Sequence, residues 1–305
     1  MSWKQNNMDS ELLSICIPTR NRSYWLDISL NALINDIHKY GITPEVLKIY
    51  ISDNCATDNT PELIRQFQTK YSGLIYTRNA TNIGADRNAI HCPELSHGTY
   101  VWVMGDDDSI LPGRLPQILD ILRNNRLALF INYGAQFATG FKLPGKFANF
   151  REFAQKCEKN NPQFLLSHSL VSSNIFRTEL FDHKLAIDLV NTFYGHMYGM
   201  IDKMDEKAGG VYVPEWPSLK IRNSSVDPID GVWPANLEKS WREYLAWLKK
   251  KFDLETLDPE KLNAYARRAL FLEIKTHPVN SVMHYAGFLK HKQTYKTLWK
   301  MIANK

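Results

Sequence analysis

Short apolar runs alternate with amphipathic stretches along the first third of the chain. The runs rich in strand-favouring residues are 12–19, 45–53, 73–79 and 99–104. The stretches between them, with apolar residues at mostly helical spacing, are 24–40, 60–71 and 86–97. Gly41 follows the first of these as a helix stop, and Pro61 opens the second. The alternation predicts an α/β fold with a mostly parallel sheet and helices on both faces.

The rest of the chain has a less regular pattern. We expect strands in 127–137 and 170–177, a helix within 146–169, a helix over 192–209 that Gly209 closes, and extended segments in 210–223. The C-terminal stretches 237–252, 259–274 and 288–305 read as helices.

Polar residues follow each of the first four predicted strands. The four loops read "PTRNR", "SDNCATDNT", "TRNATNIGADRN" and "GDDDS", and all are rich in Asp, Asn or Arg. In parallel sheets the loops after the carboxyl ends of the strands meet at one edge, which is where ligands bind. The sequence therefore predicts a polar ligand site at that edge.

Composition and charge narrow the class of protein. With 305 residues, 44% apolar and 23% charged, the chain reads as globular. Four isolated cysteines favour a reducing compartment. We expect a cytoplasmic protein, since the chain has neither a leader pattern nor a long apolar run.

The net charge of +5 is concentrated in the tail. Residues 241–305 hold 13 Lys/Arg against 6 Asp/Glu, interleaved with aromatic side chains. Such helices either rest on an anionic membrane face or pack on the main domain with their lysines outward, and the sequence leaves both open. Nucleic acid is not expected as a partner, because no nucleic-acid-binding motif accompanies the charge.

Three consecutive aspartates end the fourth predicted strand. Asp106 and Asp108 offer hard oxygen ligands for Mg²⁺ or Mn²⁺, leaving room for a substrate diphosphate. The alternative is an acidic cap on a helix within 110–125. We favour the metal, because one aspartate suffices for a cap.

Two other loops carry candidate binding residues. Asp53 can accept hydrogen bonds from a ribose or base, or form an Asx turn instead. In the next loop Gly84 permits close approach and Arg87 can pair with a phosphate, although a plain loop glycine and a solvated arginine fit equally. Neither GxGxxG nor a P-loop is present, so a metal would have to hold the phosphates.

His196 is the candidate general base or third metal ligand. It lies near the start of a predicted helix, among aromatic residues. A packed core histidine is the alternative and has equal weight. Asp202 lies off the same helical face and ranks lower.

Together the four loops resemble a known family in order and spacing. The segments "SICIPTRNR", "YISDNCATDNT", "NIGADRNAI" and "GTYVWVMGDDD" are similar to the N-terminal half of family 2 glycosyltransferases of the GT-A fold, nearest the bacterial O-antigen and capsule type that includes abequosyltransferase-like proteins. The resemblance covers 11–115 well and 165–225 loosely, and leaves the tail outside.

The resemblance implies a role for several residues. It places the nucleotide pocket at Pro18, Thr19 and Arg20, the base or ribose contact at Asp53, and the sugar and diphosphate contacts at Asn82, Asp86 and Arg87. The Asp-x-Asp position falls on Asp106 and Asp108, while an alignment on the last two aspartates would promote Asp107. "YGH" stands where the family commonly has an acidic pair, which puts His196 forward as the base.

The resulting hypothesis is metal-dependent, inverting transfer of a sugar from a nucleotide diphosphate sugar to a hydroxyl of a saccharide acceptor, in bacterial surface polysaccharide synthesis. A lipid-linked acceptor would give the basic tail a use at the cytoplasmic face of the inner membrane. The alternatives are a nucleotidyltransferase and a noncatalytic carbohydrate- or nucleotide-binding module. We expect a glycosyltransferase domain over 1–235, with a nucleotide-sugar half at 1–115 and an acceptor half at 116–235, and a helical C-terminal region over 236–305.

Overall fold

The computed structural model describes residues 11–262, apart from 134–142, 161, 163, 168–170, 193, 206 and 221–236. The strands are β1 (Leu13–Thr19), β2 (Leu47–Asp53), β3 (Leu74–Arg78), β4 (Tyr100–Val103), β5 (Ser109–Ile110), β6 (Leu127–Ile131), β7 (Gly145–Phe147), β8 (Asn174–Arg177), β9 (Gly210–Val213) and β10 (Leu219–Lys220). The helices are α1 (Ser23–Tyr40), α2 (Thr60–Lys70), α3 (Ala85–Leu95), α4 (Arg114–Asn124), α5 (Phe150–Asn160), α6 (Phe164–Ser167), α7 (His183–Asp188), α8 (Gly195–Ile201) and α9 (Leu237–Phe252). Short 3₁₀ turns are η2 (Val171–Ser173), η3 (Thr178–Leu180) and η4 (Val190–Thr192).

The main sheet has the strand order β3-β2-β1-β4-β8-β6-β9-β7. Its first four strands are parallel to one another, as the sequence predicts. β8 pairs antiparallel with both β4 and β6, and β7 antiparallel with β9, while β6 and β9 are parallel. The sheet is thus parallel on the side formed by the first third of the chain and mixed on the other.

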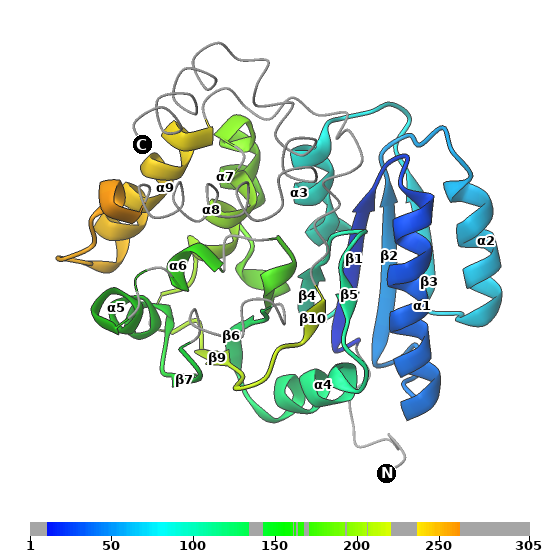
Figure 1. Cartoon of the computed structure of the whole chain (residues 1–305), viewed down its shortest axis with the longest axis horizontal. Coiled ribbons are helices and arrows are strands. Elements are labelled where there is room, and N and C mark those ends of the chain that lie inside the picture. Colours follow the sequence, from blue (N-terminus) through cyan, green and yellow to red (C-terminus); the bar gives the residue numbers. More distant parts are fainter. Residues whose placement is uncertain are drawn as a thin grey trace, which may run out of the picture.

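Helices cover both faces of the sheet, as predicted (Figure 1). Leu13, Ile15 and Ile17 of β1 pack with α1, α2 and α4. Cys16 of the same strand lies in a second cluster with residues of α3, α5, α8 and α9. The period-2 alternation of a strand therefore divides β1 between two cores, one on each side of the sheet.

The basic, aromatic helix α9 packs into the second core. Its Trp241, Tyr244, Leu245 and Leu248 are buried there, and the Tyr244 ring stacks on that of Tyr194 at 5.7 Å. For α9 the structure shows the packing alternative, with its aromatic face against the main domain. The second basic stretch, 288–305, lies outside the described residues, and the predicted boundary at 236 stays a prediction.

No helix in the described part of the chain is long and apolar enough to cross a membrane.

Some predicted elements need correction. The helix expected over 192–209 is wrong in length: α8 ends at Ile201, and Gly209 lies in the turn before β9. Beyond the helix, the Asp205 carboxylate accepts the Lys207 N–H at 2.9 Å, a local bond that competes with helix formation. The sequence also gave no sign of β7 and α7. Predictions over 134–137, 221–223 and 263–305 lie outside the described residues.

The helix-cap alternative for the three aspartates is wrong, because α4 begins only at Arg114 and takes its cap from α1. The buried Asp36 carboxylate accepts the Gly113 N–H at 2.9 and 3.0 Å and the Leu115 N–H at 3.4 Å. A carboxylate at this position satisfies backbone donors that a helix start leaves open and matches the positive end of the helix dipole.

We expect Asp36→Ala to destabilise the protein by about 1–3 kcal/mol, because buried N–H groups lose their acceptor. Equilibrium urea unfolding measures the loss. Asp120→Ala, which removes an exposed aspartate from α4, is the control and should change stability by less than about 0.5 kcal/mol. Equal effects of the two substitutions would contradict the capping role.

Candidate functional site

Three parallel strands end level with one another at the edge where the sequence predicts a site. Thr19 at the end of β1 pairs in register with Asp53 of β2, and Asp53 with Arg78 of β3. β4 stops earlier, since its last residue, Val103, lies opposite Cys16. The chain that leaves β4 therefore has room to cross the end of β1.

The three aspartates occupy that crossing. A turn closed by the Asp108 N–H on the Gly105 carbonyl at 3.2 Å carries them. Thr19 Oγ1 donates to Asp106 Oδ2 at 2.7 Å, and Ser172 Oγ donates to Asp108 Oδ2 at 2.5 Å. Both carboxylates are largely buried. The turn is thus fixed to β1 on one side and to η2, just before β8, on the other.

Arg22 supplies a positive charge to this turn. Its Nε lies 3.1 Å from Asp106 Oδ1 and its Nη2 lies 2.8 Å from Asp107 Oδ2. Burial nevertheless raises the pKa of the Asp106 carboxyl to about 7, against the lowering influence of Arg22 and Thr19. The sequence analysis quoted the loop that contains Arg22 but named only Pro18, Thr19 and Arg20.

Asp53 is completely buried, and both of its oxygens have donors. Oδ1 accepts the Ala56 N–H at 2.7 Å, which is a local turn, and Oδ2 accepts the Tyr76 hydroxyl at 2.5 Å. Arg78 Nη1 lies 3.6 Å from Oδ2. The turn is present, and a contact with base or ribose stays a prediction.

A network of asparagines joins the second and third loops. Asn54 donates to Asn82 Oδ1 at 2.7 Å and accepts the Ile83 N–H at 2.8 Å. Asn88 of α3 binds the Ser52 hydroxyl and carbonyl of β2, at 2.7 and 2.9 Å. These bonds fix the start of α3 beside the end of β2, and they place the predicted Asn82 next to the Asp53 loop.

The first turn of α3 carries Asp86 and Arg87. Arg87 is exposed, whereas Asp86 is half-buried and burial raises its pKa to about 6. The charge of Asp86 contributes to raising the pKa of Tyr194, which immediately precedes α8. α3 packs against α8, and Gly84 with φ +89° is the residue before α3.

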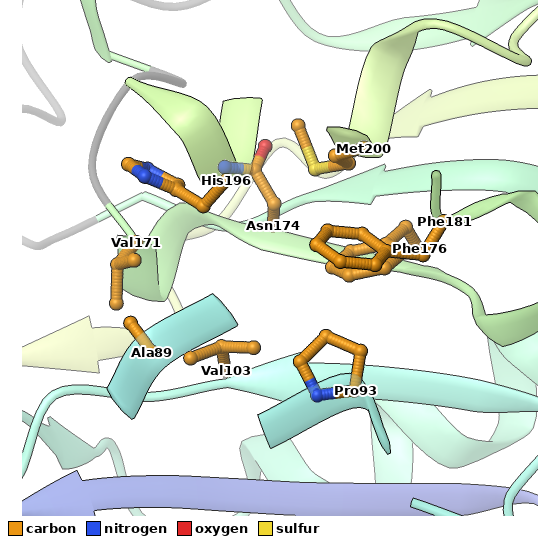
Figure 2. A pocket seen from close by; sticks show the side chains of 9 residues that line it. All are labelled: Ala89, Pro93, Val103, Val171, Asn174, Phe176, Phe181, His196 and Met200. Atoms are coloured by element: carbon orange, nitrogen blue, oxygen red, sulfur yellow. The ribbon is translucent and has the colours of Figure 1, made fainter. Parts of the chain in front are cut away.

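His196 lies at the end of a mostly apolar pocket between α3, β4, β8 and α8 (Figure 2). Val103, Phe176 and Met200 are among its apolar walls, and Asn174 is a polar one. Figure 2 shows the imidazole at the same end of the pocket as Val171. Val171 lines the pocket, and the next residue, Ser172, donates to Asp108. The pocket is therefore connected to the aspartate turn through η2.

The donor set of the turn fits a hard divalent cation. Carboxylate oxygens are the ligands that Mg²⁺ and Mn²⁺ prefer, and such ions are often held by one or two carboxylates together with substrate phosphates. Within the described ranges no three His, Cys, Asp or Glu side chains are grouped to hold a metal. A cation held by Asp106 and Asp108 would complete its coordination with oxygens from water or from a ligand.

The structure brings most of the predicted residues to one edge. Thr19 and Asp106 touch each other, Pro18 and Arg20 flank Thr19, and Asp53 and Asn82 lie beside them. His196 lies in the pocket between α3 and α8, and Asp86 lies in the first turn of α3. Sequence reasoning missed Arg22, Ser172 and Tyr76, because their roles depend on contacts between segments distant in sequence.

The fold and this edge define the class: an α/β protein of the GT-A type. Residues 14–183, more than half of the chain, match the profile of Glycosyl transferase family 2. The chain therefore belongs to glycosyl transferase family 2.

Among curated proteins, the abequosyltransferase RfbV of Salmonella typhimurium is 41% identical over 100 residues, which cover 32% of this chain and 29% of that protein. The chain spans less than two thirds of the length of the curated relatives it matches.

Two kinds of solved structure share the fold. Residues 1–349 of S. aureus TarS in complex with UDP-GlcNAc align with a TM-score of 0.54 at 15% identity, covering 89% of this chain and 75% of that one. The mannosyltransferase PcManGT of Pyrobaculum calidifontis, in complex with GDP-Man and Mn²⁺, aligns with a TM-score of 0.50 at 14% identity, covering 94% and 83%.

The raised pKa of Asp86 gives a pH-dependent prediction. The folded carboxyl titrates near 6 and an unfolded one near about 3.9, so the native state binds more protons between these values and stability falls as pH rises through them. Asp86→Asn has no carboxyl at this position, so its stability lacks this pH-dependent loss. We expect the variant to gain about 1 kcal/mol on the wild type between pH 5 and pH 7.5.

Urea unfolding at the two pH values measures the difference, with Asp120→Asn as the exposed control. Parallel pH profiles of wild type and Asp86→Asn would overturn the assignment.

Proposed function

We propose that this chain transfers a sugar from a nucleotide diphosphate sugar to a hydroxyl group of a saccharide acceptor, with inversion at the anomeric carbon. The observation that carries the proposal is the aspartate turn, which lies bonded to Thr19 across the end of β1 and beside the buried Asp53. Ligands of open α/β sheets bind at this edge.

The comparisons support this choice of chemistry. A relative at 41% identity is an abequosyltransferase, and the two structures that share the fold hold UDP-GlcNAc and GDP-Man with Mn²⁺. We extend to this chain the use of a nucleotide sugar and of a divalent cation, Mn²⁺ or Mg²⁺. The relation to an abequosyltransferase favours a role in bacterial surface polysaccharide synthesis.

On the donor side, each loop has a distinct task. Pro18, Thr19 and Arg20 line the nucleotide pocket, and Asp53 holds the base or ribose. Asn82 and Arg87 lie at the start of α3, whose positive dipole end favours an anionic diphosphate. Asp106 and Asp108 would hold the divalent cation, with Asp107 as the alternative ligand. When bound, the cation neutralises charge on the departing diphosphate.

On the acceptor side, His196 takes the proton of the attacking hydroxyl. Its ring lies at the end of the pocket near Val171, and the next residue in the chain, Ser172, donates to Asp108. A base on this side of the donor sugar allows attack on the face opposite the leaving diphosphate, which inverts the anomeric carbon.

Whether the acceptor carries a lipid is a separate matter. The aromatic face of α9 is buried, so a contact with the cytoplasmic face of the membrane would have to use other residues. We therefore propose a saccharide acceptor and assign no membrane contact to α9.

A donor screen tests the function directly. The protein is incubated with UDP-, GDP-, CDP- and dTDP-sugars, Mn²⁺ and saccharide acceptors, and the released nucleotide is identified. Release of a nucleoside diphosphate is expected. Release of sugar 1-phosphate, with transfer of the nucleoside monophosphate, would point to nucleotidyl transfer, and binding without release would point to a noncatalytic module.

Asp108→Ala should abolish metal-dependent turnover, because a cation ligand is lost, while the protein stays folded by circular dichroism. Turnover with Mn²⁺ and with EDTA is compared for the wild type, Asp108→Ala and the exposed control Asp120→Ala. Full activity of Asp108→Ala with EDTA present would refute the metal role.

His196→Asn should lower kcat by about 10²–10⁴-fold with little change in donor affinity, as expected for loss of a general base. His91→Asn, which alters a partly exposed histidine of α3 paired with Glu94, is the matched control. Unchanged kcat in His196→Asn would transfer the role to another group.

A further inference from the structure

The guanidinium of Arg22 bridges two of the three aspartates. It contacts Asp106 Oδ1 at 3.1 Å through Nε and Asp107 Oδ2 at 2.8 Å through Nη2. The side chains of Arg22 and Asp107 are 19% and 18% exposed, so this pair lies at the rim of the turn, whereas Asp106 is 8% exposed. Two contacts from one planar group match the fork geometry of arginine.

The backbone on both sides of Arg22 is held by the loop after β2. Asn21 has a left-handed φ of +55°, and its Oδ1 accepts the Thr57 N–H at 2.6 Å. Ser23 N–H donates to Asp58 Oδ2 at 3.0 Å. With both neighbours fixed, any displacement of the Arg22 guanidinium has to come from rotation of its side chain.

Arg22 contacts a carboxylate oxygen of Asp106 that could otherwise bind a metal ion. Asp106 Oδ1 faces Arg22, and Asp106 Oδ2 accepts the Thr19 hydroxyl. A divalent cation that binds Asp106 through Oδ1 therefore competes with the guanidinium for the same atom. A guanidinium set free at this rim is next to the site where a diphosphate would lie, and bidentate phosphate pairing is a favoured arginine interaction.

We propose that Arg22 is a resident counter-cation of the aspartate turn, which a divalent cation replaces at Asp106, and that the released guanidinium then pairs with the diphosphate of the nucleotide. This inference rests on the proposed function and assigns Arg22 as a positioning residue for it. Arg22 makes binding of the metal alone unfavourable and binding of metal with nucleotide favourable, so the two ligands bind with positive coupling.

The experiment measures binding and does not depend on turnover. Mn²⁺ binding to wild type and Arg22→Ala is measured by electron paramagnetic resonance without nucleotide. Binding of UDP, GDP, CDP and dTDP with Mn²⁺ present is measured by calorimetry. We expect Arg22→Ala to bind Mn²⁺ alone at least threefold more tightly, and to bind the nucleoside diphosphate at least tenfold more weakly.

Two further variants separate exchange from other effects. Arg78→Ala removes the same charge from the same sheet edge, where Arg78 contacts Asp53 and the Ala56 carbonyl, so it should change Mn²⁺ affinity less than Arg22→Ala does. Arg22→Gln keeps much of the side-chain length without the charge. It replaces Arg22→Ala in both binding measurements if Arg22→Ala does not fold. A purely structural role for Arg22 would weaken Mn²⁺ binding in both Arg22 variants.

The results distinguish the two levels of the proposal. Mn²⁺ binding by the Arg22 variants that is no tighter than in the wild type overturns the exchange. If the Arg22 variants bind the nucleoside diphosphate as tightly as the wild type does, the pairing of the guanidinium with the diphosphate is overturned. If the wild type binds none of the four diphosphates, the proposed function fails, while the Mn²⁺ measurements still decide whether Arg22 shields the turn.

Discussion

Three neighbouring carboxylates at the end of a buried strand repel one another, and the surrounding loops are arranged around that repulsion. Thr19 donates to Asp106, Ser172 donates to Asp108, and Arg22 spans Asp106 and Asp107. These donors come from the end of β1, from the start of α1 and from the segment before β8. The turn is thus bonded both to the parallel part of the sheet, at β1, and to the segment that enters the mixed part, just before β8.

Buried carboxylates at the two ends of β1 differ in how their charge is balanced. Near the amino end, Glu11 accepts the Ser14 hydroxyl at 2.5 Å and the Tyr50 hydroxyl at 2.9 Å, and pairs with Lys48 at 3.2 Å. One carboxylate there has three partners, an arrangement that suits a structural role. At the carboxyl end, three neighbouring carboxylates share contacts with Thr19, Ser172 and Arg22, and the pKa of Asp106 stays raised. A carboxyl with a raised pKa inside a cluster of like charges is a candidate functional group.

The parallel half of the fold could be predicted from sequence because its signals are local. Strand-forming runs, Pro61 and Gly41 each act within a few residues, and α9 matches its predicted span of 237–252. The meeting of the polar loops at one sheet edge could be predicted from the parallel topology alone. Arg22 and Ser172 could not be ranked in the same way, because an arginine in a polar loop and a serine before a strand look ordinary until chain segments far apart are brought together. The length of α8 was misjudged because the Asp205 turn outweighs a favourable helical pattern. The roles of Asp53, Asn82, Asp86, Arg87 and His196 toward a ligand remain predictions.

The cap that Asp36 places on α4 has a consequence for the aspartate turn. The chain is fixed at Asp106 by Thr19 and again at Gly113 by Asp36, and the residues between include β5, which pairs with β10. A segment this short with attachments at both ends and between them has little slack, so its conformational entropy is already low before any ligand arrives. The length of this segment is therefore constrained as well as its side chains, because an inserted residue would have to be accommodated between fixed points.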